Sequence, residues 1–223
     1  MTRREAAQRI SRILKRYASA SDPAALDILP KALTAGKLYE AYALGLVARH
    51  LVTREGNRLT LVNGNYLPLK SAPGPINRSY PHIKVAREGA TVAEIWTDIE
   101  FLAMSHCMRP PCPPQKGEYH ELDIAIIDPN LSGRPRNNQI WLAVECKNTG
   151  YHKGLLKEVL GVRRELSLLS DSRQTRFDQW PRKTVPCDPP SCLLVYSTDS
   201  NVAEFSRPGE IFGIDFFHEE LIL

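Results

Sequence analysis

Long apolar runs are missing from this chain of 223 residues. No stretch approaches the roughly 20 apolar residues that a membrane-spanning helix needs. The opening residues, MTRREAAQRI, also lack the apolar segment of a secretory signal peptide. We therefore expect a cytoplasmic protein with no membrane partner. Cysteine is scarce as well: five residues, an odd number, do not make a complete disulfide framework and fit reduced thiols.

A strong excess of one charge is also absent. The chain carries 29 Lys and Arg against 25 Asp and Glu, a net charge of +4, which permits a polyanionic partner without requiring one. Its length and its 43% hydrophobic content fit one globular domain with an ample core. We expect residues 1–36 to form an N-terminal helical extension and residues 37–223 to form the main domain.

Two short apolar runs carry charges where buried strands should not. They are HELDIAIID (residues 120–128) and IWLAVECKN (residues 140–148), and their composition predicts neighbouring strands of a mixed sheet. Side chains alternate along a strand, so Glu145 and Lys147 share a face, and Asp123 on the neighbouring strand can lie beside Glu145. A buried ion pair adds little stability, whereas a divalent cation would use both carboxylates. The pattern therefore favours a metal-binding phosphoryl-transfer site.

This arrangement resembles the PD-(D/E)XK superfamily of restriction-endonuclease-like nucleases, whose signature is an acidic residue on one strand and E-x-K on the next. HELDIAII followed by IWLAVECKN is especially similar to prokaryotic members in defence and repair, although no proline precedes Asp123. The resemblance covers roughly residues 37–217. It implies an α/β fold with an αβββαβ core, in which helices flank a mixed central sheet and extra helices precede it.

The resemblance also implies a chemistry. Asp123 and Glu145, with the backbone carbonyl of Cys146, would hold Mg²⁺, for which Mn²⁺ could substitute, and Lys147 would orient or activate the attacking water. Glu40 is a further metal-ligand candidate, because a helix before the sheet often contributes a glutamate; it could equally be a solvated acid in a first helical turn. The implied activity is endonucleolytic hydrolysis of DNA in a prokaryotic antiviral defence system. Other subunits of a defence complex and a homo-oligomer stay open.

Several basic residues are candidates for phosphate contact. A helix expected over residues 153–170 carries a stripe of Lys153, Lys157 and Arg164 that begins next to the motif, although an ordinary solvated face would look the same. A helix over residues 3–20 is arginine-rich opposite its apolar side, so it is either a phosphate-contacting arm or a solvated face. Glu121 shares the face of Asp123 and is either a further ligand or a hydrated acid.

Two C-x4-C pairs, at Cys107 and Cys112 and at Cys187 and Cys192, invite a zinc interpretation. Their spacing is looser than the usual C-x2-C of structural zinc sites, so no structural zinc is expected.

The remaining expectations concern the elements around the motif. Residues 52–90 should be largely irregular, with a short strand at 59–62, and Glu94, Asp98 and Glu100 should form an exposed or edge-facing row of acids on a first core strand. The expected elements are helices 23–35, ended by Gly36, and 37–51, core strand 91–105, parallel strand 191–199, helical turn 202–205 and edge strand 211–217.

Two alternatives to the nuclease remain. One is a non-catalytic module that keeps the fold and binds nucleic acid or assembles a larger complex. The other is a purely structural role, in which Glu145 and Lys147 are a satisfied ion pair and the basic faces are solvated surface. A cleavage activity that depends on Mg²⁺ distinguishes the nuclease from both, because an ion pair does not require the metal.

Overall fold

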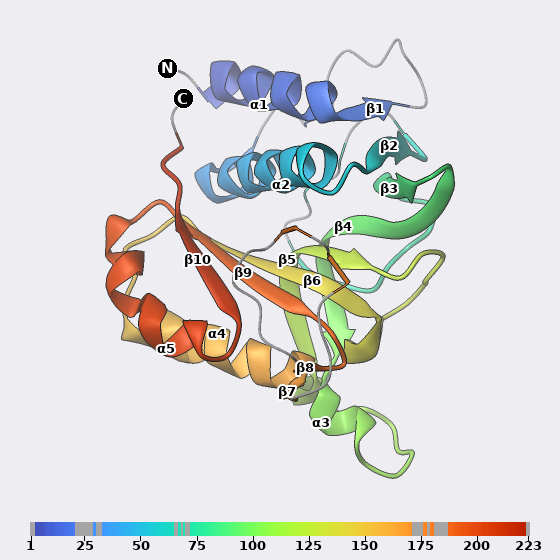
Figure 1. Cartoon of the computed structure of the whole chain (residues 1–223), viewed down its shortest axis with the longest axis vertical. Helices are drawn as coiled ribbons and strands as arrows, with labels where there is room; N and C mark the ends of the chain where they lie inside the picture. Colours follow the sequence, from blue (N-terminus) through green and yellow to red (C-terminus); the bar gives the residue numbers. More distant parts are fainter. Residues whose placement is uncertain are drawn as a thin grey trace.

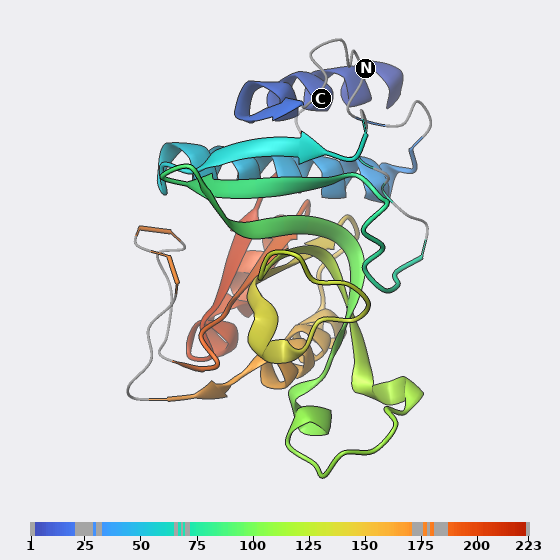
Figure 2. The same cartoon turned by 90° about the vertical axis from the view of Figure 1, so that its right-hand side faces the viewer.

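The computed structural model describes residues 3–20, 29, 33–64, 67, 69, 72–170, 176–177, 179–180 and 187–221. Within these residues an eight-stranded mixed sheet, in the order β1-β2-β3-β4-β5-β6-β9-β10, separates two layers of helices (Figures 1 and 2). Helices α1 and α2 cover one face, and α4 and α5 cover the other. The expected α/β class with a mixed central sheet is confirmed. No described helix is both long and apolar enough to cross a membrane.

The N-terminal part adds a second helical layer and an edge strand. Helix α1 (Arg3–Tyr17) leads into β1 (Ala18–Ala20), which pairs in parallel with β2, and α2 (Ala35–Thr53) lies between α1 and the sheet. Because α2 is covered on both sides, it is apolar almost all round. Its N-cap is Thr34, whose hydroxyl accepts the backbone N–H of Lys37 at 3.2 Å.

Two expectations concern residue 36. Gly36 lies inside α2, so the expectation that it ends a preceding helix is wrong. Most of the expected helix over residues 23–35 lies outside the described residues. The expected division of the chain at residue 36 falls within α2, and buried side chains of α1 belong to the same apolar cluster as those of α2, namely Ala6, Ile10 and Leu14.

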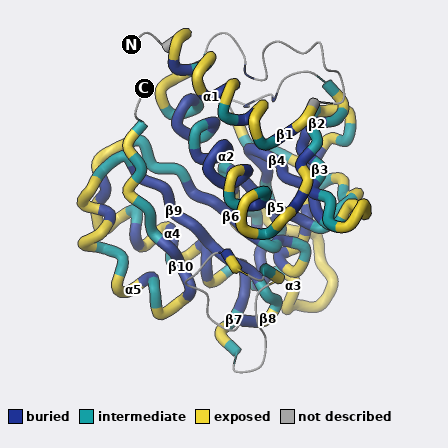
Figure 3. The backbone as a smooth tube through the Cα atoms, turned by 45° about the horizontal axis from the view of Figure 1, so that its top comes forward, coloured by how far each residue is buried: buried dark blue, intermediate teal, exposed yellow. Residues whose placement is uncertain are grey.

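Five consecutive strands form an antiparallel meander. They are β2 (Arg58–Val62), β3 (His82–Arg87), β4 (Ala90–Leu102), β5 (Tyr119–Ile127) and β6 (Ile140–Lys147). Strand β3 lies within residues 52–90, so the expectation that this segment is largely irregular is wrong there. The predicted strands that carry the charged motif are confirmed, and Figure 3 shows that they are buried over most of their length.

The chain then crosses over and adds two parallel strands. Helix α4 (Lys153–Leu166) connects β6 to β9 (Cys192–Ser197), which runs parallel to β6 and is buried throughout, as expected. The 3₁₀ turn η3 (Ser200–Phe205) and α5 (Ser206–Glu210) lead to the edge strand β10 (Ile214–His218), also parallel. A small separate pair, β7 (Leu168–Leu169) and β8 (Cys187–Asp188), follows α4, so that helix ends four residues earlier than expected.

The expectation that the acids on β4 form an exposed row is wrong for Glu94 and Asp98. Glu94 and Asp98 are fully buried, because β4 is an interior strand between β3 and β5. The Glu94 carboxylate forms an ion pair with Arg78 and accepts hydrogen bonds from the Trp96 indole (3.1 Å) and from the backbone N–H of Asn130 (3.3 Å). Burial alone would raise the pKa of Glu94, but these donors, together with His82, hold it well below its usual range.

Candidate active site

The site forms where β5 leaves β6. The ladder between these strands pairs Ile124 with Val144 and goes no further toward Asp123, whereas β6 continues to pair with β9 as far as Lys147. In the resulting gap, the backbone N–H of Cys146 donates to Oδ2 of Asp123 at 2.6 Å. The structure therefore brings Asp123 next to Glu145, which precedes Cys146 on β6.

Strand β4 is irregular at the same level. Asp98 has a φ of 52°, a left-handed conformation that is uncommon for a residue other than glycine. The ladder skips it: Thr97 pairs with Ile124, and Ile99 pairs with Leu122. Its carboxylate forms an ion pair with the ammonium of Lys37, which extends from α2. An acid that received little weight from the sequence thus lies beside the motif, together with a lysine that was not anticipated.

Lys147 lies between two carboxylates. Its Nζ is 3.0 Å from Oε2 of Glu145 and 2.8 Å from Oε1 of Glu158, the latter on α4. Burial by itself would lower the pKa of Lys147, but these two carboxylates outweigh it and raise the pKa above its usual value. Lys147 is therefore an ammonium ion at neutral pH. The side chain of Glu158 is 53% exposed, so its pair with Lys147 adds about 1 kcal/mol or less to stability.

Glu40 approaches the same place from α2. It lies in the second turn of that helix, where the helix dipole has little effect, and its Oε2 accepts a hydrogen bond from Lys37 at 2.7 Å. Burial, and then the charges of Asp123 and Asp98, raise the pKa of Glu40 to about 7 against the opposing effect of Lys37. Glu40 is therefore a largely buried acid rather than a solvated one.

Carboxylates outnumber ammonium groups around this gap. Burial raises the pKa of both Asp123 and Glu145, and the charge of Asp123 raises that of Glu145 further. Burial, and then the charges of Asp123 and Asp98, also raise the pKa of Glu121, which lies two residues before Asp123. Such crowding in a low dielectric is unfavourable until a cation or protons neutralise it. The charged groups concerned are Glu40, Asp98, Glu121, Asp123, Glu145, Glu158, Lys37 and Lys147.

The donor set suits a hard cation. Asp123 and Glu145 supply carboxylate oxygens, and Cys146 supplies a backbone carbonyl; Mg²⁺ typically takes one or two carboxylates and completes its shell with water and substrate phosphate. In the described part of the chain, no group of three or more His, Cys, Asp or Glu side chains is arranged to hold a metal ion. Two carboxylates and one backbone carbonyl are the protein oxygens that this gap brings together.

No protein-family model, curated protein or solved structure matches the chain. A fold by itself does not establish an activity, whereas the chemistry of a site constrains it.

The candidate phosphate contacts on α4 are all exposed. Lys153 opens the helix soon after Lys147, and Lys157 follows one turn later. Arg164 lies eleven residues beyond Lys153, which at 1.5 Å per residue is roughly 16 Å farther along the helix axis. Arg164 lines a cavity beside Leu160 and Phe212. The stripe thus begins at the site and runs away from it.

Other predicted features lie apart from the site. Helix α1 packs on α2, which lies between α1 and the strands that carry the motif (Figure 1). All five cysteines are free thiols. Cys107 and Cys112 are exposed in the connection after β4, whereas Cys187 and Cys192 are buried beside β9.

Proposed function

We propose that this protein is a Mg²⁺-dependent nuclease that hydrolyses phosphodiester bonds of DNA. The observation that carries the proposal is the meeting of Asp123, Glu145 and Lys147 where β5 separates from β6. The order of the surrounding elements is compatible with it: α2 precedes an antiparallel meander whose last three strands are β4, β5 and β6, and α4 leads to β9, parallel to β6. In the αβββαβ core that the sequence resemblance implies, β2 and β3 would be additions between the first helix and the three strands.

The proposed reaction adds water to phosphorus and breaks a phosphorus–oxygen bond, and the leaving oxygen takes up a proton. A bound Mg²⁺ would neutralise the phosphate and lower the pKa of a coordinated water. Asp123, Glu145 and the carbonyl of Cys146 would hold it. Lys147 keeps its proton, so it acts as a donor: its ammonium orients the water or stabilises the negative charge that develops on the phosphoryl oxygens.

The contacts of Lys147 suit this role. Its pair with the exposed Glu158 is weak, so substrate phosphate can replace that carboxylate at little cost. Its pair with Glu145 keeps the ammonium next to the proposed metal ligand. Lys153 and Lys157, one helical turn apart on α4, would contact neighbouring phosphates. A prokaryotic antiviral setting and additional subunits follow from the sequence resemblance and belong to the same proposal.

The decisive experiment compares purified wild type with Lys147→Ala on plasmid, linear and single-stranded DNA and on RNA, in Mg²⁺, Mn²⁺ and EDTA. Lys84→Ala is the matched control, since it removes a lysine from β3, which carries none of the site residues. We expect cutting that requires metal, is lost in Lys147→Ala and persists in Lys84→Ala.

Two results would contradict the proposal. Equal cutting by wild type and Lys147→Ala would remove Lys147 from the mechanism. No cutting by wild type on any substrate, together with no rise in melting temperature on adding Mg²⁺, would leave the structural ion pair or the non-catalytic binding module. The contacts of Lys147 with Glu145 and Glu158 are compatible with that outcome, so the metal response decides.

A further inference from the structure

Two loops meet beyond one end of the candidate active site. One connects β4 to β5 through α3 (Met104–Cys107) and the 3₁₀ turn η1 (Lys116–Glu118), and the other connects β5 to β6 through η2 (Asn137–Gln139). They are joined where the backbone N–H of Leu102 donates to the carbonyl of Pro135 at 2.8 Å. The loop with α3 projects from the bottom of the molecule in both Figures 1 and 2.

Basic residues outnumber acids in these loops. Residues 103–118 and 128–139 contain two acids, Glu118 and Asp128, and four Lys or Arg residues, Arg109, Lys116, Arg134 and Arg136, here called the basic arm. Arg109 is 59% exposed even though it pairs with Glu118, and Arg134 pairs with Glu100. Lys116 and Arg136 are exposed and form no ion pair within the described part of the chain. At least two cations are thus available to an external anion.

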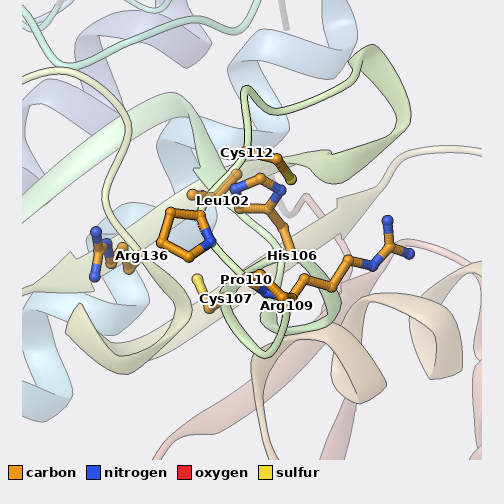
Figure 4. A pocket seen from close by; sticks show the side chains of 8 residues that line it. Leu102, His106, Cys107, Arg109, Pro110, Cys112 and Arg136 are labelled. Carbon is orange, nitrogen blue, oxygen red and sulfur yellow. The ribbon is translucent and has the colours of Figure 1, made fainter.

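A hollow separates the two loops. Arg109 and Arg136 lie on opposite sides of this cavity of about 230 Å³, and His106, Pro110 and Cys107 line it between them (Figure 4). Positive groups on both rims of a hollow attract a chain of negative charges more strongly than the same groups on a flat surface.

The arm is held in shape before any ligand binds. The carboxylate of Glu118 accepts the backbone N–H of Gln115 at 2.7 Å and pairs with His106 and Arg109, both at 3.0 Å. Four prolines, at positions 110, 111, 113 and 114, restrict the backbone between these partners. Binding therefore costs less ordering entropy than it would in an unrestrained loop.

The strands that carry the site also carry the arm. Asp98 lies on β4 four residues before its end at Leu102, so the arm begins roughly 14 Å from Asp98 at about 3.4 Å per residue. One strand of B-DNA advances about 3.4 Å per base pair. A backbone whose scissile phosphate lies at the site would thus reach the arm within roughly four base pairs.

We propose that the basic arm binds the phosphate backbone of nucleic acid to one side of the cleavage site. The inference deepens the proposed function and rests on it for the identity of the polyanion. Contacts of this kind fix the position of the nucleic acid and carry no base specificity. The arm would therefore act on every sequence alike.

Binding tests the arm without cleavage. Fluorescence anisotropy with labelled duplex DNA, single-stranded DNA and RNA in EDTA is measured over a series of KCl concentrations. The variant Lys116→Ala/Arg136→Ala removes the two cations that have no ion pair, and Arg58→Ala/Lys84→Ala on β2 and β3 is the matched control for the same charge loss. Thermal melting verifies that all three proteins fold.

The expected result is weaker binding by the arm variant alone. The slope of log K against log salt should fall by about 1.8 in magnitude, since each duplex phosphate contact adds roughly 0.9. Equal affinities and slopes for both variants would overturn the inference, as would a wild type that binds none of the three nucleic acids. Competition by polyglutamate as strong as that by DNA would assign the arm to an acidic protein instead.

The two proposals fail in different experiments. If nucleic-acid binding depends on the arm but wild type never cuts DNA, the proposal for the arm stands and the proposed nuclease activity is wrong. If wild type cuts DNA with metal but the arm variant binds as wild type does, the proposed nuclease activity stands and the proposal for the arm is wrong.

Discussion

Replacing Glu94 by glutamine tests how much the buried carboxylate of Glu94 stabilises the protein through its contacts with Arg78 and with Asn130 in the loop before β6. Glutamine keeps the size but loses the charge, and it presents an amide donor where Arg78 and the N–H of Asn130 already donate. Removing one partner of a buried ion pair costs about 3–5 kcal/mol. Because the side chain of Arg78 is 33% exposed, we expect the lower end, about 3 kcal/mol. With about 2.1 cal/mol/K per residue over 223 residues, that lowers the melting temperature by about 6 °C.

The pH dependence of this variant has a defined sign. The pKa of Glu94 is lowered by folding, so its carboxylate stabilises the protein above the unfolded value of 4.5, and that contribution is lost as the pH falls below it. From pH 7 to about pH 3, the advantage of wild type over Glu94→Gln should shrink by roughly 2 kcal/mol, at about 1.36 kcal/mol per pH unit below 4.5.

Urea unfolding monitored by circular dichroism at both pH values measures these differences. Glu100→Gln is the control, since Glu100 lies on the same strand but is 25% exposed and pairs with the exposed Arg134; we expect a change of about 1 kcal/mol or less. A Glu94→Gln variant within 1 kcal/mol of wild type at pH 7, or a difference that does not change with pH, would refute the reasoning.

Three further outcomes are expected. Mg²⁺ should raise the melting temperature of wild type but not of Asp123→Asn, and an equal rise in both would remove Asp123 from the metal site. Lys37→Met leaves the carboxylates of Glu40 and Asp98 without their shared ammonium and should destabilise the protein by about 3 kcal/mol in urea; an unchanged midpoint would contradict this. Gly209→Ala places a Cβ in steric conflict with the Phe216 ring and should cost about 1–3 kcal/mol by overpacking, whereas Gly117→Ala meets no atom within 4 Å and should be nearly neutral.

The interior strands were predictable because their apolar runs are continuous. Strands β5, β6 and β9 are covered on both faces, so composition alone marks them, and a charged residue within such a run stands out. Asp123, Glu145 and Lys147 could be singled out for this reason. The parallel pairing of β9 with β6 follows from the helix between them.

What escaped prediction depends on contacts distant in sequence. The acids on β4 alternate as they would on an exposed strand, and nothing local shows that Arg78, 16 residues away, neutralises Glu94. Lys37 meets Asp98 across 61 residues, and Glu158 meets Lys147 across eleven. The alternation of polar and apolar residues predicts which residues share a face of a strand, but it does not predict which other segments cover that face. Asp98 follows Thr97 in such an alternating pattern, whereas Asp123 lies between Leu122 and Ile124, so only Asp123 interrupts an apolar run.

The position of β6 has a consequence for assembly of the protein. On one side, β6 pairs with β5, the strand before it in the sequence, and such short-range pairings form readily. On the other side, β6 pairs with β9, which begins 45 residues after Lys147. Until that later pairing forms, β6 is an open edge and water reaches Glu145 and Lys147. A folding intermediate that lacks β9 would therefore have the charged residues in place without the low-dielectric surroundings that give them their shifted pKa values. Hydrogen exchange at the β6 amides would follow the order in which the two sides close.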